Sequence, residues 1–128
     1  MIIGVGAIGK RHLQSLIKLN GNANFYLIDP IFNYIKERKI KNFLGVKSIR
    51  SNKKIFFYKS IDDWIGKNII LDLCIIATNS DNRFSVLKKI SSSVLVKNII
   101  LEKFLFNKLT DYKKALKISN SKSNSIFV

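Results

Sequence analysis

The chain has one cysteine, one proline and one histidine among 128 residues, and eight acidic residues against 23 lysines and arginines. The single cysteine, Cys74, cannot form a disulfide within the chain, which suits the reducing cytoplasm. It lies in the apolar run Leu73–Ala77, which indicates a buried strand residue. No Cys/His cluster indicates a metal site, and a single histidine does not support a Ser-His-Asp catalytic set.

Long hydrophobic runs are also missing. No apolar run approaches the roughly 18 residues of a membrane-spanning helix, and the sequence does not start like a signal peptide. We therefore expect a cytoplasmic protein without membrane contact. The net charge of +15 would suit nucleic acid, but the lysines are scattered, which favours a solvated surface over a polyanion site. The positive field would still attract an anionic cofactor.

What is present is an alternation of apolar strand patterns and helical patterns, with 47% hydrophobic residues, which predicts one globular domain. We expect strands at 1–4, 24–28, 55–58, 72–78 and 98–101, with a sixth strand beginning at 126. We expect helices at 7–19, 31–45, 60–64, 81–90 and 110–119, and a polar turn at 119–125. This alternation predicts an α/β fold with a doubly wound parallel sheet (Rossmann fold) and strand order 3-2-1-4-5, followed by the sixth strand.

The six glycines are few, but three of them form the pattern G-x-G-x-x-G at Gly4, Gly6 and Gly9. The pattern follows an apolar strand and opens a helix, as in a dinucleotide-binding turn. Gly4 would permit the tight turn, Gly6 the approach of a pyrophosphate, and Gly9 the close packing of helix on strand. The exposed N–H groups at the helix start, around Ala7 and Ile8, would bind the phosphates. The alternative is a glycine turn that serves packing alone.

Asp29 follows the second expected strand, about 20 positions after the glycine turn. An acidic residue there binds the ribose hydroxyls of NAD and repels the 2′-phosphate of NADP, so we expect NAD to be preferred. The alternative is that Asp29 caps a helix whose first residue is Pro30. Because one carboxylate serves both roles, they compete, and we favour ribose binding.

Polar residues follow two further strands. Ligands of doubly wound sheets bind beyond the carboxyl ends of the strands, where the strand order reverses. We therefore add the following residues to the expected cofactor site: Thr78, Asn79, Ser80, Glu102 and Lys103.

Three segments resemble the glucose–fructose oxidoreductase/inositol dehydrogenase (Gfo/Idh/MocA) family of NAD(P)-dependent oxidoreductases. These are the opening segment 4–13, Ile-Ile-Ala-Thr-Asn at 75–79 and Ile-Leu-Glu-Lys-Phe at 100–104. The resemblance implies that residues 1–128 are the family's N-terminal NAD(P)-binding Rossmann domain, and that its C-terminal substrate domain is absent. It implies a sugar or sugar-nucleotide hydroxyl as the substrate.

By the same resemblance, Lys103 is the catalytic residue, which polarises the reacting oxygen or assists proton transfer while Glu102 orients it. The alternative is that Lys103 is an ordinary surface lysine. The sequence departs from the family pattern at Asn79, where proline is usual, at Arg83, where histidine is common, and at Phe104, where proline follows the lysine. The loop that carries Lys103 is therefore expected to differ.

His12 could act in a proton relay, but we favour a packed histidine near the helix start. The apolar ending 126–128 suggests a truncated chain, because a strand is just beginning there. We expect no catalysis by this chain alone, and the apolar surface that a second domain would cover favours self-association. Two rival functions stay open: a non-catalytic nucleotide-binding module, and a basic domain that binds nucleic acid.

Overall fold

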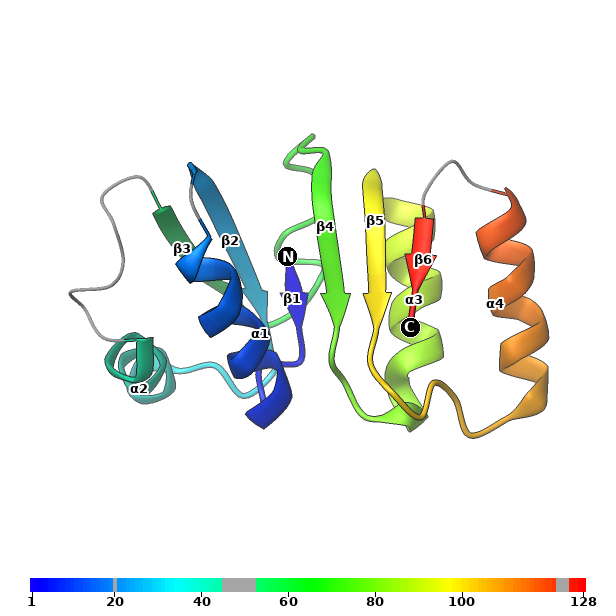
Figure 1. Ribbon diagram of the computed structural model, residues 1–128, viewed down its shortest axis with the longest axis horizontal. Coiled ribbons are helices and arrows are strands. Elements are labelled where there is room, and N and C mark those ends of the chain that lie inside the picture. The colour runs from blue at the N-terminus through cyan, green and yellow to red at the C-terminus, as the bar shows by residue number, and fades with distance from the viewer. Residues whose placement is uncertain (20, 45–52, 122–124) are drawn as a thin grey trace.

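The computed structural model describes residues 1–19, 21–44, 53–121 and 125–128. Six parallel strands form one sheet in the order β3-β2-β1-β4-β5-β6 (Figure 1). The strands are β1 (Ile2–Ile3), β2 (Ala23–Ile28), β3 (Lys53–Tyr58), β4 (Leu71–Ile76), β5 (Val96–Leu101) and β6 (Ser125–Phe127). The helices are α1 (Ala7–Lys18), α2 (Tyr34–Leu44), α3 (Ser80–Ser93) and α4 (Leu109–Ser121). The doubly wound parallel sheet and its strand order are thus confirmed.

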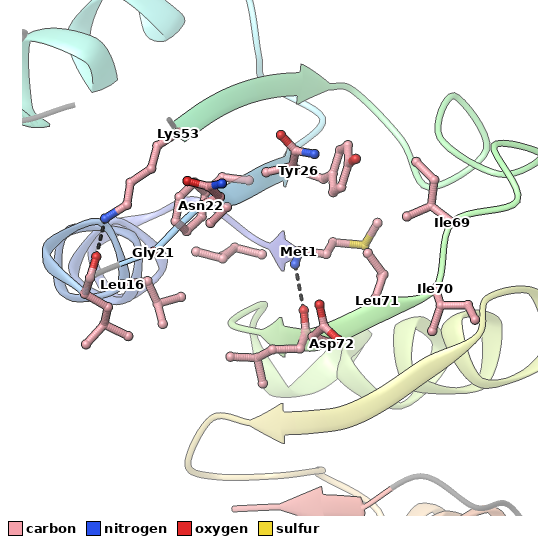
Figure 2. Close-up of a pocket in the computed structure, with 16 residues that line it drawn as sticks. Met1, Leu16, Gly21, Asn22, Tyr26, Lys53, Ile69, Ile70, Leu71 and Asp72 are labelled. Atoms are coloured by element: carbon pink, nitrogen blue, oxygen red, sulfur yellow. Dashed lines mark hydrogen bonds between the residues drawn. The ribbon is translucent and has the colours of Figure 1, made fainter. Parts of the chain in front are cut away.

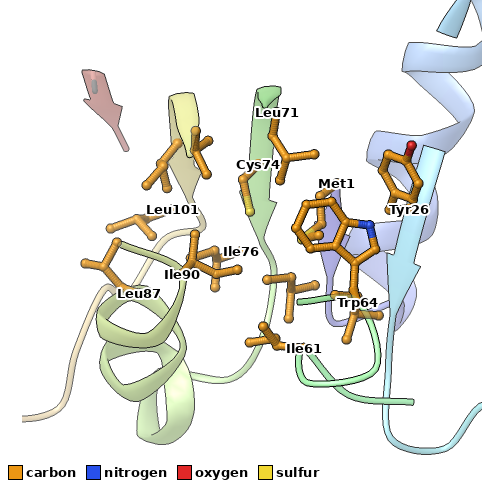
Figure 3. Packing of buried hydrophobic residues seen from close by; sticks show 14 of the residues in the cluster. Met1, Tyr26, Ile61, Trp64, Leu71, Cys74, Ile76, Leu87, Ile90 and Leu101 are labelled. Atoms are coloured by element: carbon orange, nitrogen blue, oxygen red, sulfur yellow. The ribbon is translucent and has the colours of Figure 1, made fainter. Parts of the chain in front are cut away.

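Both faces of the sheet are covered, as the unbroken apolar strands require. Alternate strand residues face opposite ways, so Ile2 and Ile75 pack with Leu13 and Ile17 of α1 in one cluster. On the other face, Ile3, Cys74 and Ile76 pack with Leu87 and Ile90 of α3 (Figure 3). Cys74 is a free, fully buried strand residue, as expected, and burial raises the pKa of its thiol to about 11.

The helices α3 and α4 are slightly longer than expected, so residues 119–121 of the expected polar turn belong to α4, and residues 122–124 lie outside the described residues. Two further helices differ more from the sequence expectation. Helix α2 begins at Tyr34 rather than at residue 31, because the Asn33 side chain accepts the Lys36 N–H at 2.9 Å and caps the helix there. Residues 60–66 form bends and turns instead of a short helix. Their capping box nevertheless exists: Ser60 N–H donates to the Asp63 carboxylate at 2.9 Å, and Asp63 N–H donates to the Ser60 hydroxyl at 3.2 Å.

Strand β1 is much shorter than its neighbours. Its two residues pair with Leu27–Ile28 of β2 and with Ile75–Ile76 of β4, at the carboxyl ends of those strands. A cavity of about 490 Å³ therefore lies between the amino-terminal parts of β2 and β4, bordered by Met1, Tyr26 and Leu71 (Figure 2). This cavity is at the opposite edge of the sheet from the glycine turn.

Among the described residues, no helix has the length and apolarity to cross a membrane. The same residues contain no group of three or more histidine, cysteine or acidic side chains that could hold a metal ion.

Candidate functional site

Two glycines of the turn between β1 and α1 are required by the fold itself. Gly4 has φ +84°, and a Cβ there would lie 2.8 Å from the Ala77 carbonyl oxygen at the end of β4. A Cβ at Gly9 would lie 2.1 Å from the carbonyl oxygen of Gly4. These glycines let the turn approach β4 and let α1 pack onto the turn, so packing accounts for both.

Packing within the fold does not require a glycine at Gly6. Its φ is −73°, which any residue adopts, and a Cβ built on it meets no atom within 4 Å. It occupies the N-cap of α1 without any side-chain hydrogen bond to the helix. The first N–H groups of α1, at Ala7 and Ile8, have no partner within the helix and lie on an exposed surface. The structure thus leaves open space over a helix N-terminus, which fits an anionic group.

Asp29 lies beside this turn, at the end of β2. One carboxylate oxygen accepts the Val5 N–H at 2.8 Å, and the other accepts the Ile31 N–H at 3.1 Å. Lys36 places its ammonium 3.4 Å from the second oxygen. Asp29 does not cap α2, which Asn33 does, so the helix-cap alternative is wrong. A carboxylate has about four acceptor positions, so Asp29 retains capacity for ligand hydroxyls.

A cavity of about 440 Å³ opens between α1 and α2, close to Asp29. Its lining is partly basic and partly apolar: Lys10, Lys36, Lys39, Asn33, Ile31, Ile35 and Ile40. Lysine and isoleucine side chains together suit a flat organic group that carries negative charge nearby.

Three predicted site residues, Thr78, Asn79 and Ser80, follow β4, and their surroundings differ. Asn79 caps α3, since its side-chain oxygen accepts the Asn82 N–H at 3.4 Å, which explains an asparagine in place of the usual proline. Ser80 is the first residue of that helix. The Thr78 hydroxyl oxygen is buried and has no hydrogen-bond partner within the structure. Buried hydroxyls without a partner are uncommon in folded proteins.

The Arg83 guanidinium forms hydrogen bonds to the chain beyond the carboxyl ends of both β4 and β5. The residue is 4% exposed, and its guanidinium donates to the carbonyls of Glu102 at 2.6 Å, Lys103 at 2.9 Å and Phe104 at 2.6 Å. It also donates to the Thr78 carbonyl. Sequence reasoning noticed Arg83 only as a departure from a histidine and missed its role in shaping the loop that carries Lys103.

Glu102 pairs with His12, although 90 positions separate them. His12 Nε2 lies 2.5 Å from a Glu102 carboxylate oxygen, and the two side chains are 30% and 25% exposed. The hydrogen bond from His12 lowers the pKa of Glu102, so the carboxyl group is ionised at neutral pH. Sequence reasoning favoured a packed histidine and gave it no partner, whereas the fold places His12 against a predicted site residue. Lys103, next in the chain, is exposed.

Phe104 has φ +52°, a left-handed conformation, and its side chain is 88% exposed. Proline, which the resembled family pattern has at this position, is fixed near φ −65° and cannot adopt this conformation. We expect Phe104→Pro to destabilise the fold by about 2 kcal/mol, and Phe104→Gly to stabilise it by about 1 kcal/mol. Urea unfolding curves measure both changes. A proline variant as stable as the wild type would mean that this loop readily takes another geometry.

No family model matches the chain, and no curated protein matches it by sequence. Solved structures do match. An oxidoreductase from Bacillus cereus is 16% identical with a TM-score of 0.72, over 98% of this chain and 33% of that one. The chain shares its fold with oxidoreductases. A myo-inositol 2-dehydrogenase from Lactobacillus plantarum is 24% identical with a TM-score of 0.72, over 98% and 34% of the two chains.

A third structure, GenD2 from gentamicin A biosynthesis in complex with NAD, is 9% identical with a TM-score of 0.67, over 98% of this chain and 32% of that one. The chain therefore spans about a third of the length of the oxidoreductases it matches. The resemblance to the N-terminal domain of Gfo/Idh/MocA-type oxidoreductases is confirmed for the fold.

Proposed function

We propose that the carboxyl edge of the sheet binds a nicotinamide dinucleotide, as the cofactor-binding part of a Gfo/Idh/MocA-type oxidoreductase. The observation that carries this proposal is Gly6, a glycine that packing does not require and that has open space above it. Gly6 is the N-cap of α1 and directly follows Val5, whose N–H donates to the Asp29 carboxylate, so a helix N-terminus and a carboxylate border the same turn and suit a pyrophosphate and a ribose respectively. Among the matched oxidoreductases, GenD2 is in complex with NAD.

Most of the predicted residues have a place in this proposal, whereas Asn79 and Ser80 form the start of α3. The N–H groups at Ala7 and Ile8 bind the pyrophosphate, and Gly4 and Gly9 shape the turn. Asp29 binds the adenosine ribose, and the cavity between α1 and α2 takes the adenine. Thr78, Glu102 and Lys103 lie on the other side of the glycine turn, at the ends of β4 and β5, where the nicotinamide half belongs. The residues present therefore fit the cofactor.

The bound cofactor would supply a hydride acceptor or donor. Lys103 would polarise the reacting oxygen, and we propose a sugar-like hydroxyl compound as the substrate. Residues 1–128 form the cofactor domain and leave the nicotinamide side open to water, so we propose that they do not turn over substrate alone. The matched oxidoreductases are about three times as long.

We expect the chain to bind NAD more tightly than NADP, because the Asp29 carboxylate repels a 2′-phosphate. Asp29→Asn removes this charge and should raise the affinity for NADP relative to NAD about tenfold, or about 1.4 kcal/mol. Lys36→Met is the matched variant: it removes the cation 3.4 Å from Asp29 and should move the ratio in the opposite direction. Isothermal titration calorimetry with both cofactors measures the ratio.

Equal or tighter binding of NADP by the wild-type chain would contradict the ribose role of Asp29. Its carboxylate would then serve only to hold the Val5 and Ile31 amides.

A further inference from the structure

The hydrogen bond between His12 and Glu102 joins two parts of the candidate site that are otherwise separate. His12 lies on α1, whose N-terminus borders the open space at Gly6, and Glu102 follows β5. In the sheet order, β4 stands between β1 and β5. The contact of 2.5 Å therefore bridges β4 and links the pyrophosphate end of the site with the segment that carries Lys103.

The backbone of Glu102 is fixed on both sides. Its N–H donates to the Ile76 carbonyl at 3.3 Å, and its own carbonyl accepts from Arg83 at 2.6 Å. His12 fixes the side chain, so the whole residue is held by β4, α3 and α1 together. Lys103 directly follows this anchored residue, and its carbonyl is also bound by Arg83.

The pair is not needed to hold α1 on the sheet. That helix is packed through Leu13 and Ile17, which are 0% and 4% exposed. The His12 and Glu102 side chains stay 30% and 25% exposed, and Glu102 follows the carboxyl end of β5, on the side of the sheet where ligands of this fold bind. A polar contact between partly exposed side chains there favours a role in ligand binding over a role in the hydrophobic core.

We propose that His12 is a positioning residue for the nicotinamide half of the cofactor: it acts through Glu102 to hold the Glu102–Lys103 segment in place. The inference rests on the proposed function, since it assumes a dinucleotide across this edge. His12 itself touches neither the adenosine nor the pyrophosphate.

The test compares two probes, NADH and ADP-ribose, which carries the adenosine and pyrophosphate but no nicotinamide. In His12→Ala, the affinity for NADH should fall about tenfold and the change in nicotinamide fluorescence on binding should shrink, whereas the affinity for ADP-ribose should stay within twofold. His12→Gln, which can still donate to Glu102, should recover part of the loss. Gln14→Ala, at a half-buried position on the same helix, is the control and should bind both probes like the wild type.

A double-mutant cycle tests whether His12 acts through Glu102. If it does, His12→Ala adds no further loss of NADH affinity when Glu102→Ala is already present. Additive losses would overturn the proposal by assigning His12 a direct contact, and so would equal losses for both probes or no loss for either. A wild-type chain that binds neither probe would overturn the proposed function and this inference with it, which is a different result from unaffected variants of a chain that binds.

Discussion

Gly6→Val is expected to abolish dinucleotide binding while the domain stays folded. The valine side chain would enter the open space at the N-terminus of α1, where the pyrophosphate is proposed to lie, and would meet no protein atom near its Cβ. We expect the affinity for NADH to fall more than about 100-fold, which corresponds to about 2.7 kcal/mol. Calorimetry measures the loss, and circular dichroism with urea unfolding shows whether the fold is intact.

Gly6→Ala is the graded control for this prediction. Its single methyl group should cost less affinity than valine, and it should change the stability of the free domain by less than about 1 kcal/mol, since glycine is only a modest N-cap residue. A folded Gly6→Val variant that binds NADH like the wild type would show that the glycine turn serves packing alone.

Gly9→Ala is expected to have the opposite consequence: a large loss of stability before any ligand is added. The new Cβ would lie 2.1 Å from the Gly4 carbonyl oxygen, which is backbone and cannot rotate away. The helix would have to move off the turn, at a cost of about 3 kcal/mol. In an unobstructed helix interior, alanine in place of glycine would stabilise the fold by about 1 kcal/mol. A loss of stability in Gly9→Ala would therefore indicate a steric clash.

The comparison with Gly6→Ala isolates the cause, because the same methyl group is added three residues away in open space. Urea unfolding of the two variants gives the difference in the free energy of unfolding. A Gly9→Ala variant as stable as the wild type would contradict the close packing of α1 on the glycine turn.

The fold could be predicted from the sequence because its signals are local. An unbroken apolar run such as Leu73–Ala77 indicates a strand covered on both faces, and Gly4 through Gly9 marks the strand-to-helix turn. The prediction was less accurate at the start of α2, where two local patterns each indicate a helix start. Asp29 and Pro30 resemble a helix start, but α2 begins at Tyr34 with Asn33 as its cap, and the Asp29 carboxylate accepts the Val5 and Ile31 amides instead.

The residues that sequence reasoning missed act over long separations. His12 and Glu102 are 90 positions apart, so no spacing rule connects them. Arg83 gains its role only once β4 and β5 are neighbours and their carboxyl ends present carbonyl groups to one guanidinium. Lys53 is a similar case: it is 6% exposed, and its ammonium donates to the carbonyls of Ile17 and Leu19 at the end of α1.

The most direct test of the central claim is a titration of the ¹⁵N-labelled chain with NADH, followed by amide chemical shifts. The account predicts that the affected amides lie at the carboxyl edge of the sheet, around Gly6, Asp29, Thr78 and Glu102. The chemical shifts of amides around the cavity at the amino edge, such as those of Tyr26 and Leu71, should not change. Shifts confined to that amino-edge cavity, or no shifts at saturating NADH, would contradict a dinucleotide site at the glycine turn.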